Sequence, residues 1–197
     1  MKQVVIVDSG GANLASLQYA LKRLGARGEV SANMRTITAA DRVLLPGVGA
    51  AAQAMRRLHR AGLLGVLRAL TQPVLGVCLG MQLLFERSEE GETDCLGVLP
   101  YTIRGLNPAQ GRPVPHMGWN TLHGLKPDPL LDGVADGDFA YFVHSYAAQV
   151  TPHTLASAQY GAPLSAIVRR DNFWGTQFHP ERSAATGAQV LHNFLRL

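Results

Sequence analysis

The sequence predicts an α/β protein built on an open, mostly parallel or mixed sheet with helices on both faces. Short apolar runs alternate with amphipathic stretches through the first half of the chain, an order typical of parallel sheets covered by helices. These runs are apolar at consecutive positions, as strands buried on both faces are. One of them ends in Gly-Val-Cys-Leu-Gly at residues 76–80. The length fits a single domain, 1–197, with one three-layer core.

The first half supplies the predicted parallel strands and most helices. Residues 4–8, 42–45 and 74–77 are short apolar runs that favour buried strands. Leucines recur at helical spacing between the first two runs, at Leu14, Leu17, Leu21 and Leu24, and Gly25 ends that helix. Residues 50–60 and 63–70 predict two further helices, and another helix is expected after the strand 74–77.

The second half is richer in strands and loops. Its strand candidates are residues 98–104, 114–116, 139–145, 154–160, 164–169 and 173–178. A final helix is predicted over residues 183–195. The proline-rich loops 107–115 and 126–129 are expected to separate elements, not domains.

Composition narrows the class of protein. The formal charge of +4 raises the question of nucleic acid, but the basic residues are scattered and no nucleic-acid motif accompanies them. A basic face is compatible with an acidic partner protein. No apolar run approaches the ~20 residues that span a bilayer, and the start of the chain does not resemble a signal peptide. Two cysteines give no disulfide framework, so a reducing cytoplasm is expected.

The segment around Cys78 has the pattern of a nucleophile elbow, with glycine two residues before and two residues after a cysteine. Such a strained turn between a strand and a helix presents the side chain over the sheet edge, where the start of the helix favours a thiolate. The backbone N–H of the next residue, Leu79, is the expected oxyanion donor. The alternative is that Cys78 is a small buried core residue, as free cysteines often are.

A second segment, His179-Pro180-Glu181, strengthens the catalytic interpretation. A histidine near a thiol accepts its proton, and a carboxylate orients the imidazole ring. Pro180 biases His179 toward an extended backbone, and alternate side chains of an extended segment share one face. We therefore expect Glu181 to reach the far nitrogen of His179.

Together these segments resemble the class I (triad) glutamine amidotransferases. More narrowly, the chain is similar to the glutaminase subunits of imidazole glycerol phosphate synthase, an enzyme of histidine biosynthesis. The matching segments are residues 8–17, 45–49, 76–90, 115–120, 141–146 and 177–183. The elbow and His-Pro-Glu are common to the triad glutaminases, whereas the segments 115–120 and 141–146 resemble the histidine-pathway branch.

The resemblance implies a flavodoxin-like fold and hydrolysis of glutamine by Cys78, His179 and Glu181. It places the second oxyanion donor at Val48, although an ordinary turn would have the same Gly47-Val48-Gly49 sequence. It assigns substrate contacts to Gly47, Gly49, Gln82, Glu90, Ser145 and Tyr146. Taken without the resemblance, Glu90 would be interpreted as a solvated loop acid.

The same resemblance implies a heterodimer in which ammonia passes to a (β/α)8-barrel synthase that makes imidazole glycerol phosphate and AICAR. Trp119 and Arg182 match positions of the docking face, although core packing is the ordinary role of a tryptophan. No cofactor is implied, and no metal-ligand spacing is found among the remaining histidines. No nucleic acid and no membrane is expected as a partner.

The sequence departs from the family pattern at several positions, and other functions fit part of its motifs. Ala12 stands where many relatives have glycine, Ala51 and Ala52 where an aromatic is common, and Arg182 where lysine is more usual. The alternatives are the glutaminase of a pyridoxal-phosphate or anthranilate synthase, a stand-alone γ-glutamyl thiol hydrolase, and an inactive module that only binds a synthase.

Overall fold

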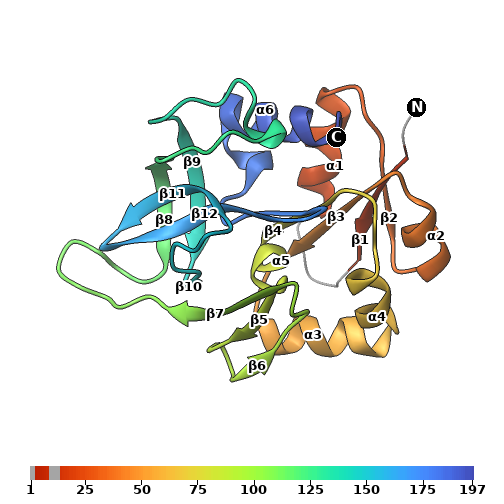
Figure 1. The fold of residues 1–197 in the computed structure, drawn as a ribbon, viewed down its shortest axis with the longest axis horizontal. Coiled ribbons are helices and arrows are strands. Elements are labelled where there is room, and N and C mark those ends of the chain that lie inside the picture. The colour runs from red at the N-terminus through yellow and green to blue at the C-terminus, as the bar shows by residue number, and fades with distance from the viewer. Residues whose placement is uncertain (1–2, 9–13) are drawn as a thin grey trace.

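The computed structural model describes residues 3–8 and 14–197, so the predicted segment 8–17 lies partly outside the described residues. The central sheet has seven strands: β1 (Val4–Val7), β2 (Gly28–Ser31), β3 (Arg42–Gly47), β4 (Val74–Cys78), β11 (Thr154–Tyr160), β12 (Ala162–Arg170) and β13 (Phe173–Thr176). Their order is β11-β12-β13-β4-β3-β1-β2 (Figure 1). The strands from β13 to β2 are parallel, and β12 and β11 add antiparallel pairs at one edge. The predicted mixed, mostly parallel sheet is confirmed.

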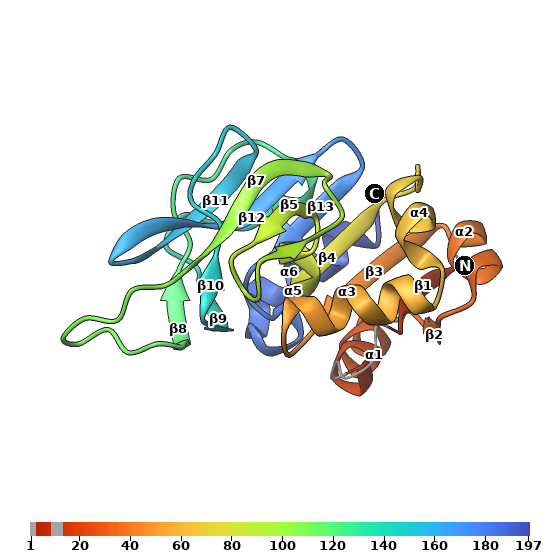
Figure 2. The ribbon, with the colours of Figure 1, turned by 90° about the horizontal axis from the view of Figure 1, so that it is seen from below.

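Helices cover both faces of this sheet, as predicted. They are α1 (Leu14–Arg23), α2 (Met34–Ala39), α3 (Ala51–Arg60), α4 (Leu63–Arg68), α5 (Leu79–Gln82) and α6 (Ala184–Phe194). Alternate residues of β1 enter different cores: Val5 packs with α2, α3 and α4, and Ile6 packs with α1 and α6. In Figure 1, α1 and α6 lie above the sheet and α3 and α4 below it, and Figure 2 looks onto the face that α3 and α4 cover.

Two smaller sheets flank the carboxyl half of the central one. The first contains β5 (Phe85–Ser88), β6 (Thr93–Asp94), β7 (Leu99–Gly105) and β10 (Tyr146–Ala147). The second pairs β8 (His116–Thr121) with β9 (Phe139–His144) in antiparallel register. Two short 3-10 helices, η1 (Pro129–Leu131) and η2 (Pro180–Arg182), complete the described elements.

Several predicted boundaries were wrong. The strand β2 and the helix α2 were not predicted, because residues 28–31 and 34–39 contain few consecutive apolar positions. Contacts with other parts of the fold, and not a local pattern, stabilise these two elements. The helix after the elbow has one turn only, since the apolar residues after it enter the buried strand β5. The strand expected at 114–116 begins at His116 and continues to Thr121, despite Gly118 within it.

The fold places the ends of three neighbouring parallel strands at one edge. Gly47 of β3 pairs with Cys78 of β4, and Thr176 of β13 pairs with Val77 on its other side. In open α/β sheets, ligands bind where strands end at this carboxyl edge. None of the helices in the described part of the chain is long and apolar enough to cross a membrane.

Candidate active site

Cys78 occupies the strained turn that the elbow pattern predicts. Its φ of 54° and ψ of −112° lie in a region that side-chain-bearing residues rarely adopt. The flanking glycines are sterically required: a Cβ on Gly76 would lie 2.7 Å from the Met81 nitrogen, and one on Gly80 would collide with the Leu45 carbonyl. The Gly-x-Cys-x-Gly spacing therefore follows from the close approach of this turn to β3.

The thiol of Cys78 is more enclosed than a side chain presented openly over the sheet edge would be. Cys78 is only 7% exposed, because β9 covers the elbow and the carbonyl of Val143 lies 3.7 Å from Sγ. The side-chain nitrogen of Gln177 lies 3.9 Å from the same sulfur. The thiol is thus held between the sheet edge and β9, out of bulk water.

His179 links the thiol to a carboxylate. Its Nδ1 lies 2.9 Å from Oε1 of Glu181, and the ring interacts electrostatically with Cys78. Burial alone would lower the pKa of His179, but the hydrogen bonds and charges of Cys78 and Glu181 raise it to about 10. The imidazolium is therefore the favoured form of this ring at neutral pH.

Glu181 contacts His179 through a backbone conformation that differs from the predicted one. His179 follows β13 in an extended conformation, but Pro180–Arg182 forms the 3-10 helix η2. The turn brings Glu181 back over the ring, so the extended-segment geometry was wrong although the contact itself is present. The N–H of His179 donates to the carbonyl of Tyr141, and the Ser183 hydroxyl donates to the carbonyl of His179. These bonds fix the histidine backbone against β9.

The loop at the end of β3 lies directly beside the elbow. A Cβ on Gly47 would approach both the nitrogen of Gly80 and the Cβ of Leu79 at 2.9 Å. Gly49 has φ of +85°, a left-handed conformation that favours glycine. The two predicted oxyanion segments, 47–49 and 78–80, are therefore neighbours in the structure.

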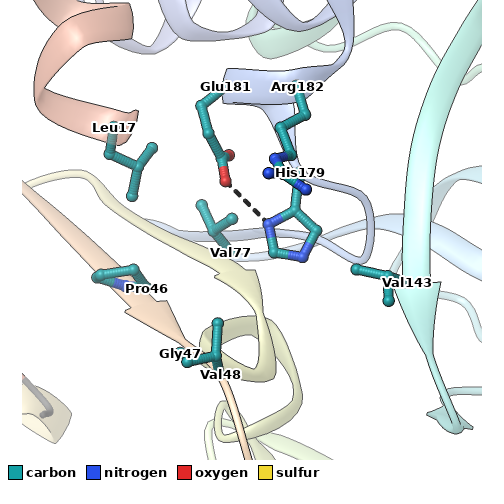
Figure 3. Close-up of a pocket in the computed structure, with 9 residues that line it drawn as sticks. All are labelled: Leu17, Pro46, Gly47, Val48, Val77, Val143, His179, Glu181 and Arg182. Atoms are coloured by element: carbon teal, nitrogen blue, oxygen red, sulfur yellow. Dashed lines mark hydrogen bonds and ion pairs between the residues drawn. The ribbon is translucent and has the colours of Figure 1, made fainter. Parts of the chain in front are cut away.

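A small cavity opens between this loop and the histidine, with a volume of about 180 Å³. It is lined by Leu17, Pro46, Gly47, Val48, Val77, Val143, His179, Glu181 and Arg182. Figure 3 shows Glu181 and Arg182 on one side of it and Gly47 and Val48 on the other. The cavity joins the predicted acid–base group to the predicted oxyanion loop.

The predicted substrate contacts divide between two locations. Gln82 is buried, and its side-chain nitrogen donates to the Tyr146 carbonyl at 2.8 Å and to Oε1 of Gln177 at 2.9 Å. Glu90 instead lies at the start of α3, where its carboxylate accepts from the N–H of Ala51 at 2.7 Å. Glu90 is thus a helix-capping acid beside the loop 47–49, in contrast to a free loop acid.

Ser145 connects β9 to β10, and its carbonyl accepts from the N–H of Leu106. The sequence interpretation missed Gln177 as a neighbour of the sulfur. Its position two residues before His179, in an otherwise apolar run, was the available signal. It also missed His116, whose ring lies 3.0 Å from His144 behind the site.

The two predicted interface residues meet on the outer face of β8 and β9. The Trp119 ring is edge-on to Tyr141 with centroids 5.8 Å apart, and the Arg182 guanidinium lies 6.0 Å from the same Tyr141 ring. Trp119 is 53% exposed, so the core-packing alternative for it is wrong. Met117 and Phe139 are also exposed on these strands. We call Met117, Trp119, Phe139 and Arg182 the β8–β9 face.

Within residues 3–8 and 14–197, the acidic, histidine and cysteine side chains form no group of three or more that could hold a metal ion. The side chains that meet around the elbow offer a thiol, an imidazole, a carboxylate and two amides.

Comparison with known families gives a match over almost the entire chain. The model of the family described as glutamine amidotransferase class-I matches residues 5–197. The chain belongs to the class-I glutamine amidotransferase family. The fold of this amidotransferase agrees with that assignment, because solved structures of similar architecture include a glutamine amidotransferase with a TM-score of 0.75 and 20% identity, covering 98% of this chain and 97% of that one.

Other relatives of this amidotransferase extend the comparison. The solved structure of PurLQS from Thermotoga maritima has a TM-score of 0.72 at 18% identity, covering 100% of this chain and 99% of its own. Among sequences, the imidazole glycerol phosphate synthase subunit HisH of Xanthomonas oryzae pv. oryzae is 52% identical over 197 residues, 100% of this chain and 98% of that protein. The protein of the same name from Xylella fastidiosa is 51% identical over the same coverage.

Proposed function

We propose that this chain is the glutaminase subunit of an imidazole glycerol phosphate synthase, and that residues 1–197 form one glutaminase domain. The observation that carries the proposal is the 2.9 Å contact of His179 with Glu181, next to Cys78 and a glycine loop. Full-length similarity at about half identity to proteins named HisH supports the pathway. A (β/α)8-barrel synthase is the partner that this proposal requires.

In the proposed reaction, the Cys78 sulfur attacks the side-chain amide carbon of glutamine. His179 has taken up the thiol proton before this attack, and Glu181 stabilises the resulting imidazolium. Collapse of the tetrahedral intermediate breaks the C–N bond, and His179 returns a proton to the leaving ammonia. A water molecule then hydrolyses the glutamyl thioester, which releases glutamate and restores the thiol.

The oxygen of the tetrahedral intermediate needs two N–H donors. We assign these to Leu79, after the nucleophile, and to Val48. The packing of Gly47 against Leu79 and Gly80 supports this assignment, because it holds both segments at the same carboxyl end. The glycines at 47 and 49 let the loop turn its peptide, so we propose that donor formation depends on the partner.

Gly47, Gly49, Gln82, Glu90, Ser145 and Tyr146 are the proposed substrate contacts. The carboxylate of Glu90 has a second oxygen with which to accept from the substrate ammonium. We propose the β8–β9 face as the docking surface, so that ammonia released at Cys78 leaves toward the synthase. Two free cysteines suit a reducing cytoplasm as the place of action.

The test is kinetic and uses the complex with a barrel synthase subunit. The wild-type complex should release glutamate from glutamine and form the synthase products. Cys78→Ala should abolish the glutamine-dependent reaction and leave the ammonium-driven synthase reaction intact. A Cys78→Ala complex that still uses glutamine would refute the proposal, whereas loss of both reactions would assign Cys78 a structural role. A chain fully active without any partner would favour the stand-alone hydrolase.

A further inference from the structure

Two buried histidines behind the active site form a direct ring-to-ring contact. His116 begins β8 and His144 ends β9, and the two are cross-strand partners in the antiparallel register. Nδ1 of His116 lies 3.0 Å from Nε2 of His144. The His116 ring is stacked between Phe142, at a centroid distance of 5.0 Å, and Tyr160, at 3.9 Å. These packing contacts leave the His116 ring little freedom to rotate.

The hydrogen-bond partners define which nitrogen of each ring carries the proton. Nδ1 of His144 lies 2.9 Å from the carbonyl oxygen of Tyr146, and a carbonyl only accepts. The proton of His144 is therefore on Nδ1, and its Nε2 is an acceptor. His116 must then donate through Nδ1, which makes its own Nε2 the acceptor for the side-chain nitrogen of Asn120 at 3.3 Å.

Both rings are neutral in this arrangement. Burial lowers the pKa of His116 to about 4 and that of His144 to about 3. A charged His144 would have no acceptor for the His116 donor, and a charged His116 would have no acceptor for the Asn120 donor, so either charge would interrupt the chain of donors. The donors consequently point one way, from Asn120 through His116 and His144 to the Tyr146 carbonyl.

The chain of donors ends on an atom that also holds active-site groups. The Tyr146 carbonyl accepts from the Gln82 side chain at 2.8 Å as well as from His144. The same Gln82 nitrogen donates to Gln177, whose own nitrogen lies 3.9 Å from the Cys78 sulfur. Displacement of the Tyr146 carbonyl would therefore shift the amide groups that face the thiol.

We propose that His116 and His144 are positioning residues for the glutaminase reaction, acting as a neutral relay that fixes the Tyr146 carbonyl and through it Gln82 and Gln177. This inference rests on the proposed function and adds two residues to it. The relay starts on β8, whose exposed residues Met117 and Trp119 belong to the β8–β9 face. Strand β8 thus carries both part of the proposed docking surface and the start of the relay.

The first test is spectroscopic and uses the wild-type chain alone. Nitrogen-15 chemical shifts of the imidazoles at pH 7 should show both His116 and His144 neutral and protonated on Nδ1. Assignment follows from His116→Asn and His144→Asn spectra. Either ring protonated on Nε2 alone, or charged, would overturn the relay, because the chain of donors would then be interrupted.

The second test is kinetic and uses the complex with the barrel synthase. His116→Leu removes the donor to His144, and we expect kcat with glutamine to fall about tenfold, as for loss of one positioning hydrogen bond. His116→Asn places an amide N–H near the position of Nδ1 and should recover most of this loss. The ammonium-driven synthase reaction should be unchanged in both variants.

The matched control is His153→Leu. Nδ1 of His153 also bonds a backbone carbonyl, that of Arg169 at 3.1 Å, but at the far edge of the sheet, so kcat should not change. Equal kcat for His116→Leu and wild type would overturn the proposal, as would equal losses in His116→Leu and His116→Asn. A wild-type complex that releases no glutamate would instead refute the proposed function, while the nitrogen-15 spectra would still decide the tautomers.

Discussion

At the residue scale, two residues of the site adopt states that are unfavourable for an isolated residue: a strained backbone at Cys78 and a buried charge at His179. Cys78 has a positive φ without being glycine, and His179 is buried yet favours its charged form. Backbone strain of this kind persists only where surrounding packing imposes it. The packing is visible at Gly76 and Gly80, which have no room for a Cβ. Individual substitutions at these positions therefore report directly on the proposed chemistry.

The titration of His179 is the first prediction at this scale. Its pKa in the folded chain is raised to about 10, by Cys78 and Glu181 against the effect of burial. Because the folded pKa exceeds the ordinary value, the group stabilises the fold fully below pH 6.5, and this contribution is lost as pH rises through about 10. NMR titration of the wild type should show the raised pKa, and Glu181→Gln and Cys78→Ala should each lower it.

Unfolding measurements provide a check on that titration. Between pH 6.5 and 10, the free energy of unfolding of the wild type should fall relative to that of Glu181→Gln. A stability difference that stays constant over this range would mean that Glu181 does not act on the His179 charge.

The glycine at the elbow gives the second residue-scale prediction. A Cβ on Gly80 would collide with the Leu45 carbonyl, a backbone atom that cannot move aside cheaply. Gly80→Ala should destabilise the fold by about 2 kcal/mol or more, as overpacking does. Gly65→Ala is the control, because open space surrounds that helical position, and it should stabilise by ~0.5–1 kcal/mol. Urea unfolding of both variants would decide, and equal effects would contradict the packing of the elbow.

At the element scale, the first turn of α3 receives its negative charge from another part of the chain. No acidic residue lies in that turn, and Ala50 makes no side-chain cap. Glu90, from the loop between β5 and β6, supplies a carboxylate to the N–H of Ala51 instead. A carboxylate at a helix N-terminus stabilises the helix through its hydrogen bond and through the helix dipole.

Glu90→Ala should therefore lower the free energy of unfolding by about 1 kcal/mol, and Glu90→Gln by less. If Glu90 also binds the substrate ammonium, both variants should raise KM for glutamine. Urea unfolding and glutamine kinetics on the same variants measure the two effects. Glu92→Ala is the control, since its ion pair with Arg87 is exposed and contributes little. Unchanged stability in Glu90→Ala would remove the capping role.

The same scale shows what the sequence could and could not predict. Periodicity located β1, α1, β3, β4 and α6, since each has an apolar pattern of its own. It failed for β2 and α2, because their positions follow from neighbours far away in the chain, and it predicted a helix at α5 without its one-turn length. The contact of His179 with Glu181 was predicted, but through the wrong backbone, since Pro180 starts a 3-10 turn.

The site residues likewise divide into those that the sequence could predict and those that it could not. Cys78, His179 and Glu181 could be selected from spacing and chemistry, and the structure brings them together. The Gln177 and His116 contacts could not, because the local segments that contain these residues do not show which distant side chains they meet. Both contacts form only when strands β8 and β9 fold over the elbow.

At the scale of the whole molecule, the β8–β9 face and the oxyanion loop meet at the cavity of the proposed site. Val48 is exposed, and Arg182 lines the same cavity while belonging to the β8–β9 face. Exposed apolar groups of this kind mark interaction surfaces. A partner seated there would contact both the oxyanion loop and the residue after the triad acid.

We therefore predict that the isolated chain is a poor glutaminase and that the barrel synthase with its nucleotide ligand activates it. A missing oxyanion donor typically lowers kcat by a factor of about 10²–10³, so we expect the partner to raise kcat by a similar factor. Glutamate production by the chain alone, with partner, and with partner plus nucleotide measures it. Trp119→Ala and Arg182→Glu should weaken the activation, and undiminished activation in both variants would place the docking surface elsewhere.

Trapping of the acyl intermediate decides whether the Cys78 sulfur is the nucleophile. The wild-type complex is mixed with glutamine, quenched in acid and digested, and the cysteine peptides are analysed by mass spectrometry. We expect a glutamyl group on Cys78 and none on Cys95, the second cysteine of the chain, which is buried and whose pKa burial raises to about 11. A glutamyl group on Cys95, or glutamate release by the Cys78→Ala complex, would contradict the proposed chemistry.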